Sequence, residues 1–186
     1  RVALIYVKDD PMKLEHFFNK YPVFKGDELA AFLAAKGPRN PRTQESLLLY
    51  HVRSGRLVRV RRSLYAVVPP GASAESYPVD PFLLASRMTK DAVLAYHTAM
   101  EFHGKGYSVY EHFTYLSATP ARPIAFRSHK FKGVRFPGAL PPEFAASFDV
   151  VKADRAGLEV RVTGLERTFV DVLHRPDLAG SWEEIW

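Results

Sequence analysis

Arginine alternates with apolar residues in one short stretch of this 186-residue chain, Gly55-Arg56-Leu57-Val58-Arg59-Val60-Arg61-Arg62-Ser63-Leu64-Tyr65-Ala66-Val67. A guanidinium is always charged, and its parallel N–H groups match the oxygens of a phosphate. A repeat of two over such a length predicts a two-stranded β-hairpin with one face in a core. We expect Val58 and Val60 to point inward and the arginines beside them to point outward. Arg61-Arg62-Ser63 would then form an exposed cationic turn.

Positive charge is concentrated in the first third of the chain. Residues 1–67 hold 13 of the 26 Lys and Arg but only 6 of the 20 Asp and Glu, a net charge of +7 against −1 for the other 119 residues. Such a positive field attracts the phosphate groups of a nucleic acid whatever the base sequence. A membrane surface would instead favour a basic amphipathic helix. Since the charge lies mainly on the expected hairpin, we expect nucleic acid and not a membrane as the partner.

Three short helices are predicted ahead of this hairpin, each with its own start and stop signals. The first begins at Asp10-Pro11 and ends at Pro22, the second begins near Asp27, and the third begins at Asn40-Pro41. Gly37-Pro38 ends the second helix and Gly55 ends the third. Three helices and a basic hairpin in this order are typical of a winged helix-turn-helix, whose third helix presents its first turn to DNA. A solvated surface hairpin is the alternative.

The third helix and the hairpin carry the expected DNA contacts. Arg42 can bond guanine through two hydrogen bonds, and Gln44 can do the same for adenine. Lys36 and Arg39, ahead of the helix, suit phosphates, and the hairpin arginines would clamp phosphates. The predicted DNA-binding residues are Lys36, Arg39, Arg42, Thr43, Gln44, Arg56, Arg59, Arg61 and Arg62. For Thr43 and Gln44, ordinary polar residues of a first helical turn are the alternative.

A second region follows a predicted linker at residues 69–79, where Pro, Gly, Ala and Ser are frequent. We therefore expect two domains, residues 1–68 and 80–186. In the second, Asp80-Pro81 begins one helix and Thr89 begins another that carries Val93, Leu94, His97 and Met100 up to Gly104. Six short β-type runs follow: Tyr107–Tyr110, Phe113–Ser117, Ile124–Phe126, Gly133–Phe136, Phe148–Val151 and Leu158–Val162. Their spacing predicts a mainly antiparallel sheet and an α+β fold class.

Two capping boxes occur near the end of the chain. Thr163-Gly164-Leu165-Glu166 predicts a last full helix, with an apolar stripe on its core face. The residues of that stripe are Leu165, Phe169, Val170 and Leu173. Ser181-Trp182-Glu183-Glu184 predicts a further helix that the remaining residues cannot complete, so we expect the natural chain to continue. At the other end, residues 1–7 are apolar enough for a short strand, and the first residue is not methionine.

The search for enzymatic chemistry is largely negative. Cysteine is absent, which excludes a disulfide framework, a thiolate zinc site and a catalytic thiol, and no nucleophile elbow, P-loop or His-Glu-x-x-His motif occurs. We expect no cofactor, no metal and no catalytic residue, with His97 as a buried core residue. A nuclease-like metal site at Asp149, Asp154 and Glu159 is the alternative. Without a secretory signal or a membrane-length apolar run, the chain is expected in the cytoplasm.

Three segments of the chain resemble the AbiEi-type antitoxin family of type IV toxin–antitoxin systems. They are the hairpin Gly55–Tyr65, the run Leu94-Ala95-Tyr96-His97-Thr98-Ala99-Met100-Glu101-Phe102-His103-Gly104, and Leu165-Glu166-Arg167-Thr168-Phe169-Val170-Asp171-Val172-Leu173. In that family a glycine usually stands where this chain has Ser63, which puts the hairpin turn in question. The family usually continues beyond the position of residue 186.

This resemblance implies a winged helix that binds inverted operator repeats in double-stranded DNA and represses its own operon. It also implies a second domain that counteracts a nucleotidyltransferase-like toxin, and leaves open whether the toxin is bound directly. DNA contact carries over to Arg42, Gln44, Arg59, Arg61 and Arg62, and no catalytic residue carries over. A metal-dependent, DNA-processing enzyme delivered by a winged helix remains the alternative from a different functional class.

Overall fold

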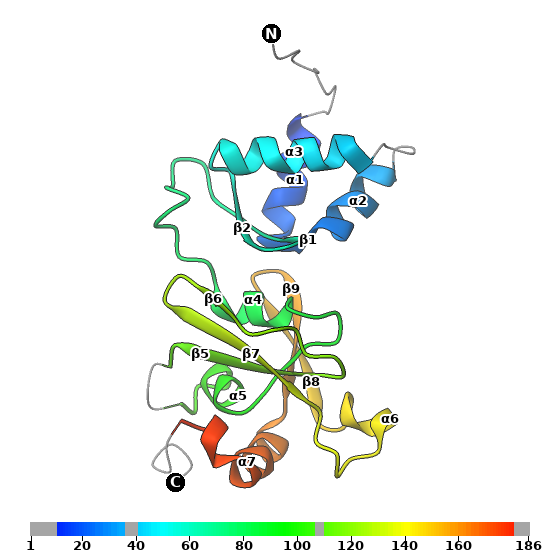
Figure 1. The fold of residues 1–186 in the computed structure, drawn as a ribbon, viewed down its shortest axis with the longest axis vertical. Helices are drawn as coiled ribbons and strands as arrows, with labels where there is room; N and C mark the ends of the chain where they lie inside the picture. Colours follow the sequence, from blue (N-terminus) through cyan, green and yellow to red (C-terminus); the bar gives the residue numbers. More distant parts are fainter. Residues whose placement is uncertain (1–10, 36–40, 107–109, 181–186) are drawn as a thin grey trace. The chain divides into compact units, whose positions relative to one another are not determined.

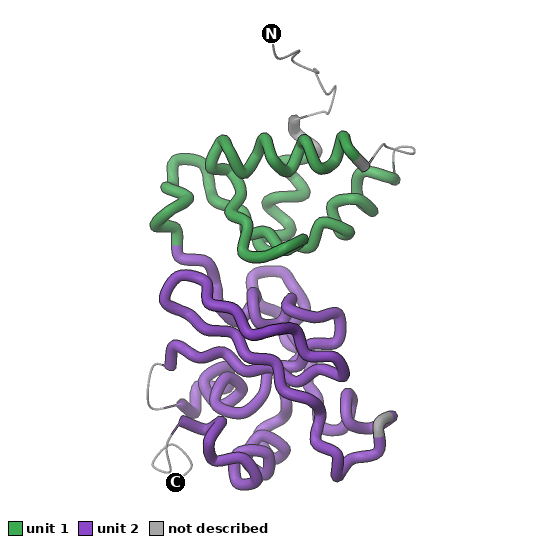
Figure 2. The backbone as a smooth tube through the Cα atoms, in the orientation of Figure 1, with its two compact units in different colours: residues 1–77 green, residues 78–186 purple. Residues whose placement is uncertain are grey.

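The computed structural model describes residues 11–35, 41–106 and 110–180 (Figure 1). The strand expected at residues 1–7, most of the run expected at Tyr107–Tyr110 and the capping box at residues 181–184 lie outside the described residues. The chain divides into two compact units, residues 1–77 and 78–186 (Figure 2). Their boundary falls within residues 69–79, where the sequence predicts a linker.

Unit 1 alternates helices with a small sheet. Its elements are α1 (Pro11–Lys20), β1 (Val23–Lys25), α2 (Gly26–Ala34), α3 (Pro41–Arg53), β2 (Leu57–Arg61) and β3 (Leu64–Val67). Helices α1 and α3 both begin at a proline, which has no N–H to leave unpaired in a first turn. The three strands form an antiparallel sheet in the order β1-β3-β2. Strand β1 is absent from the sequence prediction because three residues are too few to show an alternation.

Aromatic rings dominate the core of unit 1. Phe17 of α1 contacts Phe24 of β1 edge-on, with ring centroids 5.1 Å apart, and both side chains are fully buried. From the hairpin, Leu57 joins this core, whereas Val58 and Val60 are only half-buried and lie outside the cluster. The prediction that Val58 and Val60 point inward is therefore wrong. A register shift between Arg59 and Arg61 also interrupts the regular alternation on which that prediction relied.

Unit 2 is built around a six-stranded sheet. Its elements are α4 (Pro81–Ser86), β4 (Val93–Leu94), α5 (His97–Phe102), β5 (His112–Ser117), β6 (Ile124–Phe126), β7 (His129–Arg135), α6 (Pro142–Ala145), β8 (Val150–Arg155), β9 (Leu158–Thr163), α7 (Leu165–His174) and the 3-10 turn η1 (Pro176–Leu178). The strand order is β6-β7-β5-β4-β9-β8. The whole chain is thus an α+β protein.

The sheet of unit 2 is mixed. Strands β6 and β7, and β8 and β9, pair antiparallel, as the short spacing of the β-type runs predicts. Strand β4, which the sequence assigns to a helix, also pairs antiparallel with β5. The pairs β5·β7 and β4·β9 are parallel. Three of the five pairings between the described strands are therefore antiparallel, as expected of a mainly antiparallel sheet, and the sequence does not predict the two parallel ones. Strand β6 separates β5 from β7 along the chain, and this excursion allows β7 to return beside β5 in the same direction.

Opposite faces of β5 contact different helices. Phe113 packs edge-on against Phe82 of α4, with ring centroids 5.2 Å apart. Leu116 lies three positions further on, so it points to the other face, where it clusters with Met100 of α5 and Val172 of α7. Helix α4 therefore covers one face of the sheet, and α5 and α7 cover the other (Figure 1).

The helix predicted from Thr89 to Gly104 is divided in the structure. Val93 and Leu94 form strand β4 at the centre of the sheet, and the helix begins only at His97. Between them, Tyr96 takes a left-handed backbone conformation with φ 57°, which is costly for a residue with a side chain. Burial and the charge of Asp171 raise the pKa of Tyr96 to about 12, so its hydroxyl stays protonated. The apolar run is too short for its periodicity to distinguish a strand from a helix, which explains the error.

Helix α7 presents to solvent the stripe that the sequence assigns to the core. The exposed fractions are 43% for Leu165, 50% for Phe169, 63% for Val170 and 41% for Leu173. Its buried residues are instead Arg167, Thr168, Asp171 and Val172. The prediction of the core face is therefore wrong, because Arg167 and Thr168 of the polar face find hydrogen-bond partners elsewhere in the fold.

Asp149, and not the predicted capping box, caps helix α7. Its carboxylate accepts a hydrogen bond from the Arg167 backbone N–H at 3.0 Å, and its carbonyl accepts one from the Gly164 N–H at 2.8 Å. A Cβ on Gly164 would collide with that carboxylate, so glycine is needed for this close approach. The Thr163 hydroxyl, expected to cap, lies 2.7 Å from the Thr168 hydroxyl and is buried.

Candidate nucleic-acid interface

Gly26 joins the three elements that carry the predicted DNA contacts. Its N–H donates to the Ser63 carbonyl in the hairpin turn at 2.9 Å, and its carbonyl accepts from the Gln44 side-chain amide at 2.5 Å. Since Gly26 is also the first residue of α2, these bonds hold the hairpin turn, α2 and the first turns of α3 together. A Cβ on Gly26 would lie 3.0 Å from the Ser63 hydroxyl oxygen, so the junction leaves little room for a side chain.

A shallow open hollow of about 370 Å³ lies at this junction. Helix α2 contributes Asp27 to its lining, α3 contributes Gln44 and Glu45, and the hairpin contributes Arg59 and Arg62. The structure therefore brings the first turns of the third helix and the hairpin arginines around one surface depression. Two carboxylates share the depression with two guanidiniums, so the hollow itself is not a purely cationic surface.

The exposed arginines of this region come from two elements. Arg42 is exposed in the first turn of α3, and Arg59 and Arg62 are exposed on the hairpin. Neither the Arg59 nor the Arg62 guanidinium has a hydrogen bond or ion pair with another residue that the structure describes. Arg61 and Thr43 are half-buried. The predicted contacts Lys36 and Arg39 lie outside the described residues.

Arg56, which the sequence predicts as a DNA contact, is engaged within the fold. Its guanidinium forms an ion pair with Glu15 of α1, donates to the Val68 carbonyl and lies 5.6 Å from the Phe18 ring centroid. Only 13% of its side chain is exposed. The alternation that places Arg56 in a series with Arg59 and Arg61 does not reveal that it meets an acid 41 positions earlier.

Gln44 also serves the fold. Its side-chain amide is half-buried and committed to the Gly26 carbonyl, so the pair of hydrogen bonds predicted with adenine would require breaking that bond. This bond favours the alternative in which Gln44 is a polar residue of the first helical turns and not a base contact, although the sequence does not indicate Gly26 as its partner. Glu45, next to it, is exposed and faces the hollow, and sequence reasoning does not single it out. Its only signal is its place in the first turns of α3.

Ser63 takes the backbone conformation that a glycine would favour at this turn. Its φ is 62°, within the left-handed region. The doubt that a serine at this position raises about the hairpin turn is thus answered by geometry. The serine pays a modest conformational cost, and the carbonyl it presents accepts the Gly26 N–H.

The acids of the alternative metal site do not gather. Asp149 caps α7, the Asp154 carboxylate accepts the Gly157 N–H at 3.3 Å, and Glu159 pairs with Lys152 at 3.2 Å. Among the described residues, no group of three or more His, Asp or Glu side chains is placed to hold a metal ion. The nuclease-like alternative therefore gains no geometric support from these residues.

The two resembling segments of unit 2 meet in one apolar cluster, which contains Tyr96 and Met100 of the first and Val172 of the second, and each also makes polar contacts with other parts of the unit. His103 of the first lies with its Nε2 2.8 Å from the Thr163 carbonyl, which directly precedes α7. His97 is 1% exposed, as predicted, and its Nδ1 lies 4.0 Å from the Glu101 carboxylate. Arg167 of the second segment reaches the carbonyls of Phe148 and Ala145. These contacts hold the fold of unit 2 together.

Within the described part of the chain, no helix combines the length and the apolar character needed to cross a bilayer.

Comparison with known proteins gives a likeness of fold. No family model matches the sequence, and no curated protein matches it. Among solved structures, the chain is similar to the RV2827C protein from Mycobacterium tuberculosis, with a TM-score of 0.57 and 18% identity over 94% of this chain and 63% of that one. The chain thus spans 63% of the length of the protein it matches. At this level of identity the two proteins share an α+β fold, and nothing further follows.

Proposed function

We propose that unit 1 is a winged-helix DNA-binding domain. The observation that carries this proposal is that Gly26 bonds the hairpin turn and the first turns of α3 together, with exposed arginines on both. The element order of helix, strand, two helices and hairpin, with an antiparallel sheet in the order β1-β3-β2, supports it as well. In a winged helix these same two elements contact the groove and the backbone.

The arginines are assigned different roles in this proposal. Arg59 and Arg62 lie on the hairpin and contact phosphates, because a guanidinium there meets the DNA backbone whatever the base sequence. Arg42 begins the recognition helix and contacts a guanine edge. The carboxylates of Asp27 and Glu45 repel phosphates, so the DNA backbone lies at the rim of the hollow and not inside it. Glu45 is then placed to accept from a cytosine amino group.

A salt titration tests the assignment of the hairpin arginines. The probes are a duplex carrying the inverted repeat upstream of the chain's own gene and a scrambled duplex of equal length. Arg59→Ala and Arg62→Ala should each weaken both duplexes alike and reduce the slope of log affinity against log salt by about 0.9. Arg42→Ala should lose roughly 1–3 kcal/mol on the repeat and much less on the scrambled duplex.

Two further variants serve as controls. Arg135→Ala removes one exposed charge from unit 2 and should leave the slope unchanged. Arg56→Ala removes the ion pair with Glu15, so it should lower the free energy of unfolding without the slope change of the hairpin variants. Equal losses for Arg42 and Arg59 on both duplexes would show that the assigned roles are wrong. Unchanged binding in all three hairpin and helix variants would reject the winged-helix function.

We further propose, from the resemblance of its three segments, that the chain is an operon repressor and an antitoxin against a nucleotidyltransferase-like toxin. If so, co-expression of the full natural chain with the toxin encoded next to it should restore growth. Arg59→Ala/Arg62→Ala should relieve repression of a reporter and still restore growth, because DNA contact lies in unit 1 and antitoxicity in unit 2. Loss of both activities together would contradict this division.

A further inference from the structure

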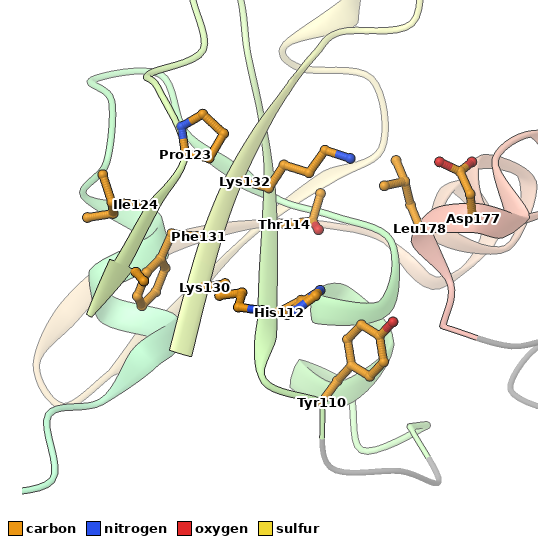
Figure 3. Close-up of a pocket in the computed structure, with 11 residues that line it drawn as sticks. Tyr110, His112, Thr114, Pro123, Ile124, Lys130, Phe131, Lys132, Asp177 and Leu178 are labelled. Atoms are coloured by element: carbon orange, nitrogen blue, oxygen red, sulfur yellow. The ribbon is translucent and has the colours of Figure 1, made fainter. Parts of the chain in front are cut away.

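One face of the β5·β7 pair changes from apolar to cationic along its length. The parallel register places His112 beside Lys130, Thr114 beside Lys132, and Leu116 beside Val134. These residues alternate with the core residues Phe113 and Phe131, so all six point to the same face. The apolar row, Leu116 and Val134, packs into the cluster formed with α5 and α7. The two polar rows form the floor of a pocket, in which Thr114 is buried and both lysines are exposed (Figure 3).

Two lysines dominate the charge of this pocket. Lys130 and Lys132 are both exposed, and two positions along a strand separate their Cα atoms by roughly 6.6 Å. Lys130 ends beside His112, and Lys132 extends toward η1, where Asp177 lies (Figure 3). Arg175 holds the Asp177 carboxylate through two hydrogen bonds of 2.8 Å. The acid that lines the pocket is thus already paired with another cation, and the pocket keeps its positive charge.

The electrostatics of Asp177 agree with this arrangement. The hydrogen bonds from Arg175 are the main reason that its pKa lies below the ordinary value of 3.8, and Lys132 lowers the pKa of this carboxyl further. Asp177 is therefore ionised throughout the neutral range and bound to Arg175. It serves to fix η1 in place rather than to neutralise the lysines.

Apolar and aromatic groups form the walls. The Tyr110 ring lies between two histidines, with centroids 4.8 Å from His97 and 5.2 Å from His112. His97 is buried, so it anchors this ring from within the fold. Ala125, which pairs with Lys130 and faces the same side of the sheet, and Leu178 complete an apolar lining at other points of the rim. A site with a few convergent charges in a largely apolar lining is the usual form of a small-molecule pocket.

We propose that this pocket binds a phosphate ester carrying a planar ring, of the size of a nucleoside monophosphate. Its volume of about 370 Å³ suits a ligand of that size. Lys130 and Lys132 hold the phosphate from two sides, as lysines do when they act as compact point charges. The ring lies against the Tyr110 wall and Ala125, which is paired with Lys130 and faces the same side of the sheet. The phosphate ester comes either from a free nucleotide or from the phosphorylated end of a single strand.

This site is independent of the proposed DNA contacts of unit 1. It is built from β5, β7 and η1, all of which belong to residues 78–186, and it uses none of the arginines of the hairpin. Net charge hides it from the sequence, because residues 68–186 sum to −1 and the two lysines are cancelled by acids elsewhere. Only the parallel pairing of β5 with β7 places them beside His112.

Calorimetric titration of the full chain with adenosine 5′-monophosphate tests the proposal. We expect saturable binding of one nucleotide per chain, at least about tenfold tighter than adenosine, ribose 5-phosphate or inorganic phosphate, because each of these lacks one of the recognised parts. Lys130→Ala/Lys132→Ala should weaken binding by about tenfold or more. A 5′-phosphorylated single-stranded hexanucleotide is titrated in parallel. Whichever of the two ligands binds more tightly identifies the source of the phosphate ester, a free nucleotide or the end of a strand.

Three variants keep the result interpretable. Lys152→Ala removes an exposed lysine of β8, outside the pocket, and should bind the nucleotide as the parent chain does. Ala125→Glu places a carboxylate beside Lys130 on the rim and should abolish binding, with an unchanged circular dichroism spectrum as proof of folding. The double variant Arg59→Ala/Arg62→Ala should leave the nucleotide affinity unchanged, whatever its effect on DNA affinity. The nucleotide proposal and the DNA-binding proposal can therefore fail separately. Absence of saturable binding, or equal affinity in the double-lysine variant, would overturn the proposal.

Discussion

Arg167→Leu should lower the free energy of unfolding by about 3–5 kcal/mol, the range found when one partner of a buried ion pair is removed. The guanidinium is almost fully buried, donates to the carbonyls of Phe148 and Ala145, and has its Nε 3.5 Å from the Asp171 carboxylate. Leucine would leave both carbonyls without a donor and the carboxylate without a counter-charge. Urea unfolding at neutral pH measures the loss.

A double variant separates the charge from the packing. Arg167→Leu/Asp171→Leu removes both partners, so it should regain part of the stability that Arg167→Leu loses. If the losses of the two single variants simply add, the pair does not interact in the way its geometry indicates. The matched control is Arg175→Leu, whose ion pair with Asp177 is exposed and should contribute no more than about 1 kcal/mol.

The loss should also depend on pH. Burial raises the pKa of Asp171 in the folded protein, and Arg167 opposes that rise. A carboxyl whose pKa is raised on folding binds more protons in the native state, so its stabilising effect is greatest below its unfolded pKa and is lost as pH rises through the folded value. Removing Arg167 removes the opposing effect and raises this pKa further. Arg167→Leu should therefore be less deficient near pH 4 than near pH 8, a difference that urea unfolding at both values would reveal.

Element boundaries in this chain are largely predictable because their causes are local. Proline begins α1 and α3, and the Asp80 carboxylate accepts the N–H groups of Phe82 and Leu83 at the start of α4. Each of these signals acts within about one helical turn, so it can be recognised in the sequence. Partners distant in sequence leave no such signal. Asp149, which caps α7, lies 15 positions before Gly164, whose N–H donates to the Asp149 carbonyl. No local pattern in the sequence predicts this contact.

The same distinction explains the outcome at the candidate DNA interface. A basic hairpin after a helix is visible in the sequence, and the structure places exposed Arg59 and Arg62 on that hairpin. Arg56 and Gln44, predicted as DNA contacts, both have partners within the fold. Both side chains are of types that bind DNA. Their internal partners, Glu15 and Gly26, belong to elements distant in the sequence, so the sequence does not reveal these contacts. Residue type reveals what a side chain can bind, and only the fold reveals what it already binds.

Leu116→Ala should destabilise the chain by about 2–5 kcal/mol, whereas Phe169→Ala should change the free energy of unfolding by no more than about 0.5 kcal/mol. Leu116 is fully buried in the cluster against which α7 packs through Val172. Phe169 is half-exposed on the opposite face of the same helix. A sequence-based ranking would place Phe169 in the core, because its stripe recurs at helical spacing.

Comparison of these two variants therefore tests which face of α7 is buried. An apolar stripe shows that a helix has two unlike faces, but burial of its polar face becomes favourable only when every polar group finds a partner. Arg167 and Thr168 find such partners in Ala145, Phe148 and Thr163. A loss at Phe169→Ala as large as that at Leu116→Ala, measured by urea unfolding of the same chain, would mean that the stripe is covered in solution and that the orientation of α7 is wrong.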